Sequence, residues 1–145
     1  MNLQTDKIHV EADDVFILGN VSALALEYQL GEKIEPILSF LKLIRPLNAG
    51  PFLLEAQYLE GQGKTAKALS AIEQCKISEA EQNKEQAAFY HLHLTHKEGL
   101  TDQLIALGEA YLEKNLFTEP DFVHVVTKMI NAAKKEQGLT KGGGS

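Results

Sequence analysis

The segment EGQGKTAKA, residues 60–68, allows two incompatible interpretations of the fold. Gly63-Lys64-Thr65 has the ending of a phosphate-binding P-loop, whose full pattern is G-x-x-x-x-G-K-[ST] between a strand and a helix. The first glycine of that pattern would fall at Tyr58. The preceding segment, PFLLEAQYLE, has a helical rather than a strand pattern. We therefore exclude a nucleotide site and interpret the glycines as a turn between two helices.

Helical periodicity extends outward from this turn over most of the chain. No run of alternating β-branched residues predicts a strand. Glycine, proline and Ser/Thr signals predict helices over about residues 13–31, 32–45, 51–61, 64–75, 78–97, 101–114 and 118–138.

Several of these boundaries depend on capping signals. Ser78-Glu79-Ala80-Glu81 has the pattern of a capping box, and Thr101 and Thr118 stand where the next two helices are expected to begin. Pro120 suits the first turn of the last helix. Gly138 is expected to end that helix, because glycine accepts a positive φ without a Cβ clash.

The spacing of the glycine breaks indicates a repeat. Gly31, Gly63 and Gly99 are separated by 32 and 36 residues, which brackets the 34-residue period of tetratricopeptide (TPR) repeats. We predict an all-α fold of about three TPR-like helix-hairpin pairs in a right-handed superhelical stack, closed by a C-terminal capping helix. The middle pair fits best, since small Ala56 and Ala68 fall where the two helices approach.

The expected domain organisation is simple. Residues 1–12 would be an N-terminal extension, residues 13–139 a single TPR-like domain, and residues 140–145 a flexible linker or engineered tail, since they end in KGGGS.

Composition excludes several classes of function. The net charge of −6 argues against nucleic-acid binding, which needs a clustered basic face. No apolar run approaches the ~20 residues of a membrane helix, so we expect no membrane insertion. The polar start lacks the build of a signal peptide, and the single cysteine, Cys75, fits a reducing compartment, so we expect a cytoplasmic protein.

The sequence offers little support for catalysis. His91, His93 and His96 lie close together, and His93 with His96 has the spacing of a metal-binding pair on one helix face. We favour half-buried or groove-lining imidazoles, with metal binding and pH sensing as alternatives. Cys75 falls at a buried small-residue position. No catalytic residues, metal or cofactor are predicted, and we do not expect an enzyme.

A partner-binding groove is the expected functional feature. In stacked helix hairpins the first helix of each pair lines the concave side. The repeat register places these residues there: Leu18, Val21, Ala25, Tyr28, Leu53, Gln57, Glu60, Phe89, His93 and His96. This partly apolar set suits an amphipathic helix or an extended peptide with hydrophobic anchors. Alternatively, Leu53 and Phe89 pack only against neighbouring helices or the C-terminal helix.

The glycine-spaced units LEYQLGEKIEPILSFLKLIRP, PFLLEAQYLEGQGKTAKALSAIEQC and AAFYHLHLTHKEGLTDQLIALGEAYLE carry a family resemblance. Over about residues 13–114 and the terminal helix, the chain resembles the small TPR-like chaperones of bacterial type III secretion systems. The resemblance implies a cytosolic chaperone that cradles a secreted needle or translocator subunit and prevents its premature assembly. In the needle class a small helical co-chaperone is a further partner. The alternative function is a TPR-like scaffold subunit that acts through its convex face or its C-terminal helix.

Overall fold

A computed structural model describes residues 31–142 of the chain. Over this range it consists of helices: α2 (Gly31–Ile44), α3 (Gly50–Gly61), α4 (Thr65–Glu73), a short 3₁₀ turn η1 (Ile77–Glu79), α5 (Lys84–Lys97), α6 (Thr101–Glu113) and α7 (Pro120–Gly142). Within the described range no strand forms, and Asn48 and Gln82 make an isolated bridge. The all-α prediction is confirmed for these residues. The first expected helix, with Leu18, Val21, Ala25 and Tyr28, lies outside them.

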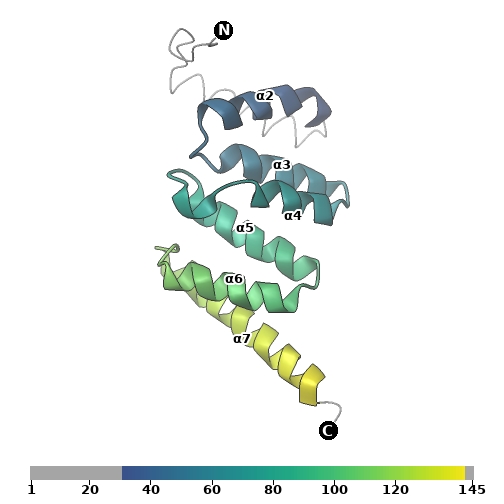
Figure 1. Cartoon of the computed structure of the whole chain (residues 1–145), viewed down its shortest axis with the longest axis vertical. Helices are drawn as coiled ribbons and strands as arrows, with labels where there is room; N and C mark the ends of the chain where they lie inside the picture. The colour runs from purple at the N-terminus through teal and green to yellow at the C-terminus, as the bar shows by residue number, and fades with distance from the viewer. Residues whose placement is uncertain (1–30, 143–145) are drawn as a thin grey trace.

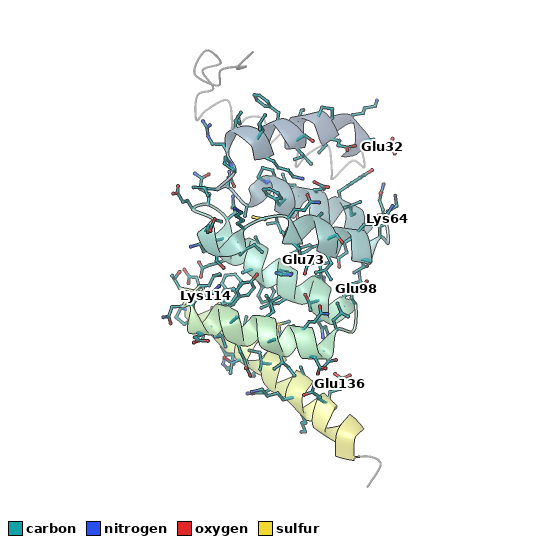
Figure 2. All side chains as sticks on the ribbon, in the orientation of Figure 1. Glu32, Lys64, Glu73, Glu98, Lys114 and Glu136 are labelled. Carbon is teal, nitrogen blue, oxygen red and sulfur yellow. The ribbon has the colours of Figure 1, made fainter. Side chains whose placement is uncertain are left out.

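The helices follow one another along the long axis of the molecule, from α2 to α7 (Figure 1). The turns at Lys64 and Glu98 lie on one side of the stack, and the turn at Lys114 lies on the other (Figure 2). Consequently α3, α5 and α7 run in one direction, and α2, α4 and α6 run in the opposite one. Consecutive helices pack together, and α3 also contacts α5. The right-handed TPR superhelix stays a prediction.

Two of the predicted glycine turns end helices in the same way. At the end of α3, the Gly63 N–H donates to the Glu60 carbonyl at 2.8 Å and the Lys64 N–H donates to the Leu59 carbonyl at 2.9 Å. This pair of bonds is a Schellman motif, which satisfies carbonyls that the helix leaves free. Gly99 makes the equivalent bond to His96 at the end of α5. Both glycines have positive φ, 77° and 72°, so the GQGKT segment is a helix-ending turn.

The end of α6 uses the same motif without a glycine. Asn115 has a φ of 52°, and the Leu116 N–H donates to the Tyr111 carbonyl at 3.1 Å. Asparagine tolerates the left-handed conformation better than most residues. Buried Leu116 follows it, and it anchors the chain before α7 begins.

The core runs between the helices along the stack. Ala56, Ala68 and Ile72 are fully buried where α3 meets α4, as the repeat register predicts. Helices α6 and α7 approach closely at Gly108. A Cβ on Gly108 would lie 2.8 Å from the Ile130 side chain, so glycine is needed for this spacing.

The capping-box prediction at Ser78–Glu81 is wrong. The segment forms η1 and an extended stretch, and α5 begins only at Lys84, after Asn83 at a φ of 59°. Pairing with the loop after α2 explains the difference. The Glu81 N–H donates to the Leu47 carbonyl at 2.7 Å, and the Ala49 N–H donates to the Gln82 carbonyl at 3.0 Å. These interhelix bonds hold the segment outside the helix.

The structure departs in part from the predicted roles of Thr101, Thr118 and Gly138 at helix ends. Thr101 is the first residue of α6 and makes no side-chain capping bond. Thr118 does precede α7, but the capping group is the Glu85 carboxylate of α5, which accepts the backbone N–H of Thr118 and of Glu119. Gly138 does not end α7, which continues to Gly142, since one helical glycine costs only about 1 kcal/mol.

Candidate functional site

The predicted groove residues within the described range lie on α3 and α5, which are neighbouring parallel helices. Leu53, Gln57 and Glu60 follow one another at intervals of four and three along α3, so they share a face. Phe89 and His93 begin the equivalent stripe on α5. We call these five residues the α3–α5 face. Its two apolar members are half-buried against the core, whereas Gln57 is exposed.

A carboxylate network joins the two helices within this face. The Glu60 carboxylate accepts hydrogen bonds from His93 Nε2 at 2.7 Å, from Lys97 Nζ at 3.0 Å and from the Tyr90 hydroxyl. The Glu60 side chain is only 16% exposed, while those of His93 and Lys97 are 42% and 48% exposed. The structure therefore brings the predicted residues Glu60 and His93 into direct contact.

The network fixes the charge of Glu60. Burial by itself would raise the pKa of this carboxyl, but the hydrogen bonds from Tyr90, Lys97 and His93 outweigh it and lower the pKa to about 2. Burial raises the pKa of the Tyr90 hydroxyl, and the bond to Glu60 raises it further. The face thus carries a permanent carboxylate that is already matched by donors.

Phe89 also contacts the C-terminal helix, which bears on the alternative that this residue serves only packing. Its ring lies 5.4 Å from the ring of Phe122 on α7, at a tilt of 55°. Phe122 in turn stacks on Phe117, at 5.9 Å. Phe89 therefore packs against the C-terminal helix, although part of its surface stays open beside Glu60 and His93.

The third histidine of the group faces the opposite side of α5. His91 is buried, with Nδ1 2.8 Å from the Tyr111 hydroxyl and Nε2 3.1 Å from the Glu73 carboxylate. Because a carboxylate can only accept, Nε2 carries the hydrogen and Nδ1 accepts from Tyr111. Glu73 points from α4 toward α5 (Figure 2). Burial lowers the pKa of His91 despite the nearby Glu73.

His96 lies apart from the Glu60 network and faces α7. It lines a cleft of about 360 Å³ with Leu104 of α6 and with Val125, Met129 and Ala132 of α7. The α7 residues of this cleft were not predicted. A signal was available, because Val125 and Met129 stand 36 residues after Phe89 and His93, and those stand 36 residues after Leu53 and Gln57.

The histidines of α5 and Cys75 lie at separate places in the structure. Among residues 31–142, no group of three His, Cys, Asp or Glu side chains could hold a metal ion. The three histidines of α5 point to three different sets of neighbours. Cys75 is buried, which raises the pKa of its thiol.

No protein-family model, curated protein or solved structure matches the chain. In the described part, no helix combines the length and the apolar character needed to cross a membrane.

Proposed function

We propose that this chain is a cytosolic chaperone or adaptor of protein export, of the type III secretion class. It binds an amphipathic helix or hydrophobic peptide of an export substrate in a concave groove of a TPR-like stack and prevents early assembly. The type III class rests on the sequence resemblance alone. The observation that carries the binding role is the α3–α5 face, where half-open Leu53 and Phe89 flank polar groups on two parallel helices.

Physical considerations support binding at this face. A partner helix needs apolar anchor sites with a few polar groups that fix its orientation. Leu53 and Phe89 supply partly open apolar surface, and His93 and Lys97 keep exposed polar atoms beside them. Glu60 is already satisfied by its three donors, so covering it with a partner leaves no buried charge without bonds.

The test compares the same substitution at two leucines. Leu53→Asp is expected to abolish recovery of a co-purifying cargo protein, identified by mass spectrometry from the native host. Leu43→Asp is the control, since Leu43 is 71% exposed on α2 and outside the face. Gln57→Lys is the second test, because Gln57 is exposed and the change does not disturb the core. Unchanged cargo recovery in both face variants, with far-UV helicity intact, would refute the proposal.

A second candidate, a scaffold subunit of a larger assembly, is favoured by one observation on α7. Val123 is 37% exposed on this helix, while Val126 and Ile130 are buried. If α7 docks the chain into an assembly, Val123→Asp removes assembly and leaves cargo binding unchanged. If the chain is a cargo chaperone, the same variant leaves both unchanged.

A further inference from the structure

A cleft lies where the end of α5 and the first part of α6 meet α7, and in the repeat register it follows the α3–α5 face by one helix. Its walls are mainly apolar, formed by Leu104, Val125, Met129, Ala132 and Ala133, with His96 at its edge. Its volume of about 360 Å³ is at the small end of the range of ligand pockets, which is enough for apolar side chains of a partner. Val125 is 41% exposed, so this wall is open to solvent, whereas Leu104 and Ala133 form the buried floor.

Two contacts hold α7 in place beside α5. The Glu85 carboxylate of α5 accepts hydrogen bonds from the backbone of Thr118 and Glu119 at the start of α7. One helical turn further on, the Phe89 and Phe122 rings are in contact. These contacts join the first turns of the two helices, and Val125 and Met129 stand 36 residues after Phe89 and His93 in the sequence.

The charge at the edge of the cleft is basic on one side. Lys128 and His96 both line the cleft, from α7 and α5. The side chain of Lys128 makes no ion pair with any residue in the range 31–142, whereas Lys134 further along α7 is paired with Glu109 at 2.6 Å. Lys128 is therefore available to an acidic group. Glu136, two helical turns further along α7, also lines the cleft, but it already interacts with another group and is not free.

We propose that this cleft is the specificity subsite of the groove: it takes an apolar anchor of a partner helix that carries a Glu or Asp one turn from that anchor. The acidic side chain pairs with Lys128 while the anchor lies against Val125, Met129 and Ala132. A positively charged residue at the same place would face Lys128 and be rejected. This inference rests on the proposed function, and it names the chemistry of the partner.

The test uses two synthetic helical peptides of about five turns. Both carry the same stripe of leucines, and they differ only in having Glu or Lys one turn from the central leucine. By fluorescence anisotropy at low salt, the Glu peptide is expected to bind at least about tenfold tighter, as charge pairs at partly desolvated sites allow. Lys128→Glu is expected to remove or reverse this preference. Lys67→Glu is the matched control, since Lys67 is exposed on α4 and the net charge changes equally.

A second variant tests the cleft itself without removing any contact of the fold. Ala132→Leu fills the cleft from an exposed helical position, where leucine is nearly as favourable as alanine. This variant is expected to weaken binding of the Glu peptide at least about fivefold, because the leucine side chain fills the space that the apolar anchor of the peptide would occupy.

The outcomes separate this inference from the proposed function. If the wild-type protein binds both peptides equally and Leu53→Asp abolishes the binding of both, the result supports the groove and overturns the specificity subsite. If neither peptide binds while native cargo still co-purifies, the subsite is also overturned. If neither peptide nor any cargo binds, both proposals fail.

Discussion

His91 and His93 stand two residues apart on α5, and each lies within hydrogen-bond distance of a glutamate of a neighbouring helix, yet their surroundings differ. His91 lies in the core beside Tyr111 and Glu73, where burial lowers its pKa, and its side chain is 11% exposed. His93 lies on the α3–α5 face, bonded to Glu60, with its side chain 42% exposed. The difference shows that one side of α5 belongs to the core, while the other side keeps polar side chains partly open to solvent.

The largest expected difference between the two sides is in stability. His91→Ala removes the partner of Tyr111 and Glu73 and leaves a cavity, so we expect a loss of about 2–4 kcal/mol in unfolding free energy. His93→Ala leaves Glu60 with two donors and is expected to cost about 0.5–1.5 kcal/mol. Urea unfolding followed by circular dichroism measures both. Equal losses would break the distinction between the two sides.

The Glu60 network is expected to give the next largest effect. Glu60→Gln places an amide against three donors and should cost about 1–2 kcal/mol at neutral pH. Since the folded pKa is lowered to about 2, the contribution of Glu60 is present above pH 4.5 and is lost as the pH falls from 4.5 toward 2. Glu98→Gln, at an exposed site just after α5, is the control and should be neutral. A Glu60 variant as stable as wild type would mean that the network is only a surface contact.

The pH dependence of the unfolding free energy tests the role of His91 on the buried side of α5. Burial lowers the folded pKa of His91, so the unfolded chain binds the proton more readily. The contribution of neutral His91 is therefore present above about pH 6.5 and is lost as the pH falls below it. We expect His91→Gln to reduce the difference in unfolding free energy between neutral and mildly acidic pH by about 1 kcal/mol. An unchanged slope would show that His91 does not resist protonation.

The smallest effect is expected for Lys97. Its ammonium group is half-exposed, and ion pairs of this kind contribute about 0.2–1 kcal/mol. Lys97→Ala should therefore lower stability by no more than this, and less at high salt, because salt screens an exposed charge. A loss as large as that of Glu60→Gln would place Lys97 at the centre of the network.

Local sequence rules predicted the helical part of the fold well. Gly63 and Gly99 were located from helical periodicity and turn chemistry, and both prove to be helix-ending turns with positive φ. These features depend on residues close together in the chain. The start of α5 was missed because it depends on the pairing of residues 47–49 with residues 81–82, which no local pattern reveals.

The candidate site was predicted in part for the same reason. Repeat spacing placed Glu60 and His93 on one face, and the structure brings them within 2.7 Å. It did not reveal that Tyr90 and Lys97 share the same carboxylate, or that Phe89 packs on Phe122. The sequence does not predict the cleft on α7, because the last helix is expected to be a cap, although its residues repeat the spacing of α3 and α5.

The most direct test of the central claim is site-specific photocrosslinking in the native host. A benzophenone side chain is placed at Gln57, on the open face, or at Lys67, on the exposed side of α4. The account predicts a cargo adduct from position 57 and none from position 67, with both variants fully folded. An adduct from position 67 with none from position 57 would contradict it.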